Sequence, residues 1–267
     1  MKKLIQVLFV IVIVLAIFIG QSEAQKLFEG YWEQTMNSKS TIPGTPANNI
    51  EKQKVFYKTG KMKMVNLEKD EIMIIRVDKE LAWNIDKKKG TYTEMKFADM
   101  QEGMKQVGDA MKKKQSEMKD MPPEQRAMME KYMGKKMMGM MGDEGGMKIS
   151  FKKTNETRTI NGYKCYKVLY ITNEEPLMEM WMTDKYQLGS EFIHLYKKMG
   201  MLKGELPEEA KNIKGFAIQS VVNMDLGMGK MESVTTVDKI VPQSISDSEF
   251  ELPNGLKKIE MPMFKNL

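Results

Sequence analysis

Short runs of β-forming residues, separated by turn residues, occupy two long blocks of the chain, and this pattern constrains the fold more than any other feature. In the first block, from Lys26 to Lys96, six such runs are bounded by turn-forming or charged residues. They predict strands at residues 28–36, 51–58, 61–67, 72–78, 81–86 and 91–95. Closely spaced strands pair antiparallel through short turns, so this block predicts a β meander.

The second block, from Lys148 onward, has the same character. It predicts strands at residues 149–154, 157–160, 163–172, 177–183, 215–224 and 231–241. Asn161-Gly162 between two apolar runs is typical of a tight hairpin. Ser190 is a candidate cap for a short helix that ends near Met201. The segment 246–255 predicts a short extended element closed by a turn.

Between the blocks, from Phe97 to about Met141, the apolar residues recur with a helical period instead. Five apolar residues share one face of a first predicted helix: Met100, Met104, Val107, Met111 and Met118. Pro122-Pro123 suits the first turn of a second helix. The sequence therefore predicts an α+β fold that is mainly antiparallel β, with an inserted helical hairpin at about 97–141 covering one face of the sheet.

The N-terminal residues predict export from the cytoplasm. Lys2 and Lys3 precede an apolar run from residue 4 to 19, and Ser22 and Ala24 form a small-x-small cleavage site. We expect a cleaved signal peptide at 1–24 and a single domain at 25–267. An uncleaved anchor is the alternative, but the run is short for a membrane span. Because no cysteine lies near the cleavage site, we expect no lipid anchor and a soluble periplasmic or extracellular protein.

Composition disfavours several classes of function. Cys165 is the only cysteine and His194 the only histidine, so no intramolecular disulfide can form and most zinc sites are excluded. The formal charge of +6 comes mainly from lysine, whereas nucleic-acid recognition favours arginine. We therefore expect no nucleic-acid partner, and weak attraction to an anionic membrane surface stays open. Cys165 and His194 are interpreted as structural, and because no catalytic motif is present we expect no enzyme activity.

A series of short motifs covers nearly the whole of the expected mature chain. It comprises Gly60-Lys61-Met62-Lys63, Ile74-Ile75-Arg76-Val77-Asp78, Trp83-Asn84-Ile85-Asp86, Thr91-Tyr92-Thr93-Glu94, Pro122-Pro123-Glu124-Gln125-Arg126, the run from Glu156 to Cys165, Glu179-Met180-Trp181 and the run from Phe250 to Gly255. In these motifs the chain resembles a family of exported bacterial proteins, the domain-of-unknown-function family numbered forty-four twelve in its series. The motifs are turns and strand aromatics, so they identify a scaffold rather than a chemistry.

The resemblance also has an implication for architecture. The family's scaffold is similar to the LolA, LolB and LppX lipoprotein-carrier group, in which an antiparallel sheet curls into an incomplete barrel and helices cover its apolar concave face. We therefore expect a LolA-like curved sheet, although the chain has no LolA-specific signature for handling lipoproteins. The family supplies no catalytic residues to transfer to this chain.

Methionine is the most unusual element of the composition, because residues 95–147 contain 14 of the 29 methionines. Three interpretations stay open. The flexible thioethers fill an irregular gap between helices and sheet, or they form an adaptable hydrophobic binding surface. Alternatively, clustered thioethers hold Cu(I), which prefers sulfur ligands. The candidate copper ligands are Met137, Met138, Met140 and Met141.

The favoured hypothesis is a non-enzymatic protein that binds a lipid or acyl chain between the sheet and the helices, without a cofactor. The candidate ligand-binding residues are Trp32, Trp83, Trp181, Met104, Met111, Met129 and Met133. For the strand aromatics, the competing interpretation is that they only form the core. A Cu(I)-buffering protein and a purely structural envelope domain are the two alternatives to ligand binding.

Overall fold

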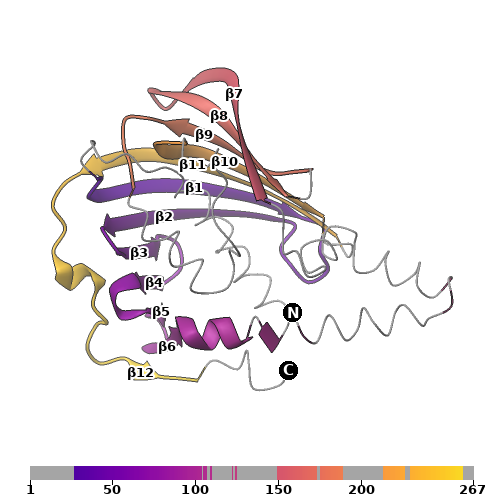
Figure 1. The fold of residues 1–267 in the computed structure, drawn as a ribbon. Coiled ribbons are helices and arrows are strands. Elements are labelled where there is room, and N and C mark those ends of the chain that lie inside the picture. Colours follow the sequence, from indigo (N-terminus) through magenta and orange to yellow (C-terminus); the bar gives the residue numbers. More distant parts are fainter. Residues whose placement is uncertain are drawn as a thin grey trace.

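The computed structural model describes residues 27–103, 105–106, 109, 122, 124, 149–172, 175–188, 213–225 and 229–260. These residues form a single curved sheet of 12 strands, which Figure 1 shows from β7 at one end to β12 at the other. The strands are β1 (Gly30–Ser40), β2 (Asn48–Lys58), β3 (Lys61–Asn66), β4 (Glu71–Arg76), β5 (Leu81–Asp86), β6 (Thr91–Lys96), β7 (Ile149–Ile160), β8 (Tyr163–Thr172), β9 (Glu175–Thr183), β10 (Phe216–Asp225), β11 (Lys230–Pro242) and β12 (Lys257–Lys258).

The sheet consists of two meanders joined side by side, in the order β12-β6-β5-β4-β3-β2-β1-β11-β10-β9-β8-β7. Neighbouring strands within each meander are consecutive in sequence and antiparallel. Short connections favour this arrangement, although residues 184–215 separate β9 from β10. The junction is the antiparallel pair β1–β11, which links the beginning of the chain to its end. Only β12 pairs in parallel, beside β6. The prediction of a mainly antiparallel, curved sheet is therefore confirmed.

Local details both confirm and correct the predicted elements. Asn161 and Gly162 form the predicted β7–β8 turn, and both have positive φ (48° and 81°), as a type I′ hairpin requires. The two strands predicted at 149–154 and 157–160 are one strand, β7, with a register shift between Lys153 and Thr157. A bulge inserts extra residues without ending a strand, which is why its polar residues look like a break in the sequence.

One α-helix occurs in the continuous described segments, beginning at residue 97 and including residues 97–103. Phe97 and Met100 are buried in the same cluster as sheet residues, so the helix packs against the sheet as predicted. The predicted helical hairpin is not supported, because the residues of its second helix lie almost entirely outside the described part, as does the helix predicted at 190–201. No helix among the described residues is long and apolar enough to cross a membrane.

The two faces of the sheet are distinguished by the ladder register. Residues opposite one another in neighbouring strands share a face, and successive residues alternate. Trp32 therefore shares its face with Val55 and Met64, and we call this side the Trp32 face. Met64 is in register with Met73, and Met73 is in register with Asn84, so Asn84 lies on the Trp32 face. Trp83 is the residue before Asn84 and therefore lies on the opposite side, which we call the Trp83 face.

A C-terminal strap, defined as residues 243–258, covers β3–β6 on the Trp83 face. It runs from the end of β11 around the sheet to β12 (Figure 1) and includes the 3₁₀ helix η2 (Asp247–Phe250). Phe250 is fully buried in a cluster with Ile74 and Trp83. Acidic strap residues form ion pairs with basic residues of the sheet, including Lys61–Asp247 at 2.9 Å and Lys63–Glu249 at 2.8 Å.

Candidate functional site

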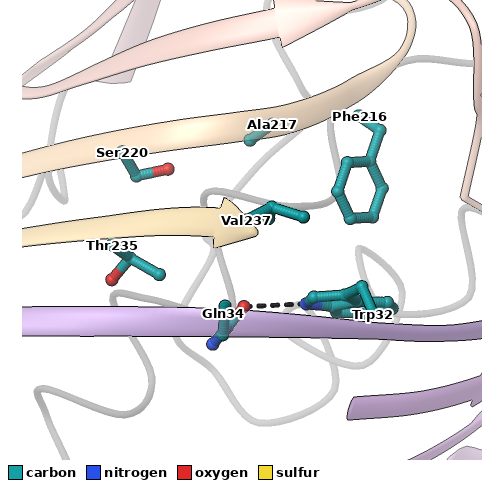
Figure 2. A pocket seen from close by; sticks show the side chains of 7 residues that line it. All are labelled: Trp32, Gln34, Phe216, Ala217, Ser220, Thr235 and Val237. Carbon is teal, nitrogen blue, oxygen red and sulfur yellow. Dashed lines mark hydrogen bonds between the residues drawn. The ribbon is translucent and has the colours of Figure 1, made fainter. Parts of the chain in front are cut away.

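A small cavity opens on the Trp32 face where β1, β11 and β10 lie side by side. Its walls are Trp32, Gln34, Phe216, Ala217, Ser220, Thr235 and Val237. Figure 2 shows the two aromatic rings at one end and the two hydroxyl groups at the other, with Gln34 and Val237 between them. The free volume is about 10 Å³, room for about one water molecule. The site therefore combines an apolar end and a hydrogen-bonding end in a confined space.

The aromatic end is held rigidly. The rings of Trp32 and Phe216 meet edge to face with centroids 5.1 Å apart, a favoured geometry for aromatic pairs. The Trp32 indole donates to Gln34 Oε1 at 2.7 Å, and Gln34 Nε2 donates to Gln53 Oε1 at 2.9 Å. Both Trp32 and Gln34 are buried, so these bonds satisfy polar groups that would be costly to leave unpaired.

The polar end carries hydroxyl groups without partners. Thr235 and Ser220 are buried and lie opposite each other in the β10–β11 ladder. Ser233 precedes Thr235 by two residues in β11 and lies on the same face. Its Oγ is fully buried and has no hydrogen-bond partner within the described part of the chain. Unpaired buried hydroxyls are uncommon in folded proteins. The hydroxyl groups of this patch can therefore form further hydrogen bonds.

Apolar clusters border the cavity on both sides. One cluster includes Trp32, Val237 and Phe216 and extends across β2–β6 to the helix that begins at residue 97. The second extends across β10, β9, β8 and β7. It contains five buried methionines: Met178, Met180, Met182, Met224 and Met231. The cavity lies where the two clusters meet, since Ala217 of the second cluster lines it together with Trp32 of the first.

Comparison with known families gives one match. The profile described as "Domain of unknown function (DUF4412)" matches residues 59–256, well over half of the chain. The chain belongs to this family. The match extends from the turn between β2 and β3 to the C-terminal strap, where it ends just before β12. It confirms the resemblance inferred from the motifs, and the family's description specifies no chemistry.

Solved structures that resemble this DUF4412 domain include three distant likenesses. PNGF-II is 13% identical, with a TM-score of 0.34, covering 87% of this chain and 33% of that one. The chain thus spans about a third of the length of PNGF-II. A LolA superfamily protein from Nitrosomonas europaea is 6% identical (TM-score 0.32, 84% of this chain, 91% of that one).

A DUF1329 family protein from Desulfovibrio piger is 9% identical, with a TM-score of 0.35, covering 85% of this chain and 91% of that one. Comparison with curated proteins found no match. Because the TM-scores are low, these likenesses do not indicate what the DUF4412 domain binds.

Of the three tryptophans of the predicted site, one, Trp32, lines the cavity. Trp83 lies on the opposite face, where its indole donates to Glu94 at 3.0 Å and its ring packs in the cluster of Phe250. Trp181 belongs to the same buried cluster as Trp32 and Phe216, but it does not line the cavity. The Arg158 guanidinium lies 3.8 Å from the Trp181 ring centroid. Sequence pattern alone could not assign these faces.

The other predicted site residues lie outside the described residues. This holds for the ligand-binding candidates Met104, Met111, Met129 and Met133 and for the copper candidates Met137, Met138, Met140 and Met141. His194 also lies outside them. Within the described residues, no group of three or more His, Cys, Asp or Glu side chains is arranged to hold a metal ion.

Cys165 is buried, and burial raises the pKa of its thiol to about 11. Its Sγ donates to the Tyr163 carbonyl at 3.3 Å. A thiol with a raised pKa carries little thiolate near neutral pH and is a poor nucleophile. These properties support the interpretation of Cys165 as a structural residue.

Sequence reasoning missed most of the cavity wall. Phe216, Ser220 and Thr235 lie in strands that were predicted, yet they drew no attention as single residues. The available signal was polar residues within otherwise apolar strands, such as Gln34 beside Trp32 and Ser220 before Val221-Val222. Such residues are unusual in a buried strand face and mark a site when they cluster.

Proposed function

We propose that this chain is a non-enzymatic protein that binds a hydrophobic ligand, such as a lipid or acyl chain, against the Trp32 face. The observation that carries the proposal is the cavity between Trp32 and Phe216, at the junction of two apolar clusters. A ligand chain that extends from this cavity over either cluster exchanges water for apolar contacts. Each buried methylene then contributes about 0.8 kcal/mol, so binding needs no catalytic groups.

The size of the cavity requires the wall to rearrange when a ligand enters. The five buried methionines of the second cluster suit this, because an unbranched thioether side chain repacks at low cost. Trp32 and Phe216 supply a fixed edge against which the chain packs. This division supports a site with one rigid wall and one adaptable wall.

The proposal includes the compartment inferred from the N-terminal sequence. Cleavage after Ala24 leaves a domain that meets its ligand in the periplasm or outside the cell. The copper alternative depends on methionines outside the described residues, and no described feature favours it over ligand binding.

Filling the cavity tests the proposal. Ser220→Leu places a larger side chain in the cavity, whereas Val221→Leu adds the same residue type to the opposite face of β10, where Val221 is partly exposed. Each purified full-length chain is titrated with the neutral probe phenylnaphthylamine, whose fluorescence rises in apolar surroundings. Wild type and Val221→Leu are expected to bind saturably with similar affinity, and Ser220→Leu at least about tenfold more weakly.

Circular dichroism and thermal unfolding verify that both variants fold. Native mass spectrometry of gently purified wild-type protein gives an independent measurement, with a co-purifying lipid as the expected result. Absence of saturable probe binding to the wild type, together with absence of any co-purified lipid, contradicts the proposal. Equal affinity of the two variants contradicts the location of the site.

A further inference from the structure

The hydroxyl end of the cavity indicates which class of hydrophobic ligand fits. We propose that the ligand is an uncharged amphiphile whose hydrogen-bonding head group, such as an alcohol or ester, lies between Ser220 and Thr235. Its apolar chain then extends past Trp32 and the adjoining apolar clusters. This inference rests on the proposed function, since it assigns a polarity and an orientation to the same ligand.

The first support is the hydrogen-bonding capacity of the patch. Side chains at opposed ladder positions have Cβ atoms about 4.5–5.5 Å apart, and Thr235 and Ser220 occupy such positions. Their exposed fractions are only 8% and 7%, and both hydroxyl groups line the cavity. Neither side chain has a hydrogen-bond partner within the described residues. A head group that both donates and accepts hydrogen bonds satisfies two such hydroxyls at once.

The second support is the position of Gln34. Its Oε1 accepts the Trp32 indole hydrogen, and one of its two amide hydrogens goes to Gln53. The second amide hydrogen is available to an acceptor beside Thr235, because Gln34 also lines the cavity. The patch therefore offers both donors and acceptors, a combination that suits a hydroxyl or an ester.

The third support is the absence of charge from the cavity wall. None of its seven residues is ionisable. Glu51 lies on the same face, opposite Met36, but its carboxylate is already paired with the Lys69 ammonium and accepts from Asn49 at 3.0 Å. Burying an ionised head group beside neutral walls is strongly unfavourable unless a counter-charge is present. The wall thus discriminates against both carboxylate and ammonium head groups.

Four ligands that share a 12-carbon chain and differ in their terminal group test this inference. Dodecan-1-ol, dodecanoate, dodecyltrimethylammonium and dodecane compete with phenylnaphthylamine for the full-length protein at about pH 8, where the carboxylate is ionised. Dodecan-1-ol is expected to displace the probe at a concentration at least about tenfold below that of either charged ligand. It should also bind more tightly than dodecane, since only the alcohol can use the hydroxyl patch.

A matched pair of variants locates the head group. Thr235→Val replaces the cavity hydroxyl by a methyl group of similar shape, and Thr236→Val makes the same change on the opposite face of β11. Thr235→Val is expected to weaken dodecan-1-ol binding about fivefold, the effect of one lost hydrogen bond. It should leave dodecane binding unchanged, and Thr236→Val should affect neither ligand.

The outcomes separate the two proposals. If dodecanoate or dodecyltrimethylammonium binds as tightly as dodecan-1-ol, the uncharged-head inference is overturned while ligand binding stands. If Thr235→Val leaves dodecan-1-ol affinity unchanged, the hydroxyls bind only water, and the inference is likewise overturned. If none of the four ligands displaces the probe, the proposed function itself fails.

Discussion

Individual polar side chains decide how the Trp32 face differs from an ordinary hydrophobic core. Gln34 is nearly completely buried, and it accepts one hydrogen bond at its carbonyl oxygen and donates one from its amide nitrogen. Ser233 has no such compensation for its hydroxyl. A buried hydroxyl without a partner costs about 1–3 kcal/mol of stability. In the absence of ligand, the site is therefore maintained at the expense of folding free energy.

Ser233→Ala tests this cost directly. Because the change removes an unpaired buried hydroxyl, we expect the free energy of unfolding of the ligand-free protein to rise by about 1 kcal/mol. Urea unfolding measures it. The control is Ser38→Ala, opposite Ser233 in the ladder, whose hydroxyl donates to the Asn49 carbonyl at 3.4 Å. That variant should be neutral or slightly destabilised, and a clear loss of stability in Ser233→Ala contradicts the account.

At the scale of elements, the sequence pattern predicted where the strands and turns lie better than it predicted which face of the sheet each strand residue occupies. The β7–β8 turn was predictable because Asn161-Gly162 adopts positive φ at low cost. The sequence pattern could not assign the two faces of β4, because its residues 74–76 are all buried. Ile75 is buried on the Trp32 face, whereas Ile74 is buried beneath the C-terminal strap. A segment about 170 residues away in sequence covers that second face, and no local pattern can reveal it.

One aromatic side chain of the strap, Phe250, is buried against the sheet. Phe250 is fully buried among residues of β4 and β5, and its carbonyl accepts from Arg76 at 3.3 Å. Phe250→Ala is expected to lower the free energy of unfolding by about 3–5 kcal/mol, because it leaves a cavity in this cluster. Ile50→Ala, at a side chain that is 58% exposed, should change it by less than about 0.5 kcal/mol. Similar effects of the two changes in urea unfolding would contradict the role of Phe250.

The ion pairs of the strap predict that the free energy of unfolding decreases at acidic pH. Hydrogen bonds from Lys61 and Lys58 lower the pKa of Asp247 from 3.8 to about 2. Lys79 and Arg76 likewise lower the pKa of Glu251. A carboxyl group whose pKa is lower in the folded state stabilises the fold above its unfolded-state pKa. This contribution is lost as the pH falls toward the folded-state value.

Asp247→Asn isolates this contribution. At about pH 6 the variant should unfold at a lower urea concentration than the wild type, and the difference should shrink as the pH falls and disappear below about pH 2. High salt should reduce the difference, because the ion pairs are exposed. A difference that persists unchanged at the acid end would contradict the assigned cause.

At the scale of the whole molecule, the curved sheet separates two tasks. The Trp83 face of β3–β6 is closed by a segment of the same chain and serves stability. The Trp32 face carries the cavity, the reserve of hydroxyl groups and the methionine-rich cluster, and it serves the proposed binding. Placing both tasks on one sheet allows the binding face to rearrange while the strap holds the opposite face fixed.

This separation provides the most direct measurement, because Trp32 and Trp83 report on opposite faces. One variant keeps only Trp32 (Trp83→Phe with Trp181→Phe), and its control keeps only Trp83 (Trp32→Phe with Trp181→Phe). Displacement of phenylnaphthylamine verifies that the control still binds the ligand. Each is titrated with dodecan-1-ol that carries a terminal bromine atom, which quenches tryptophan fluorescence on contact. The account predicts saturable quenching of Trp32 and none of Trp83. Equal quenching of both, or quenching of neither, would contradict a hydrophobic ligand site on the Trp32 face.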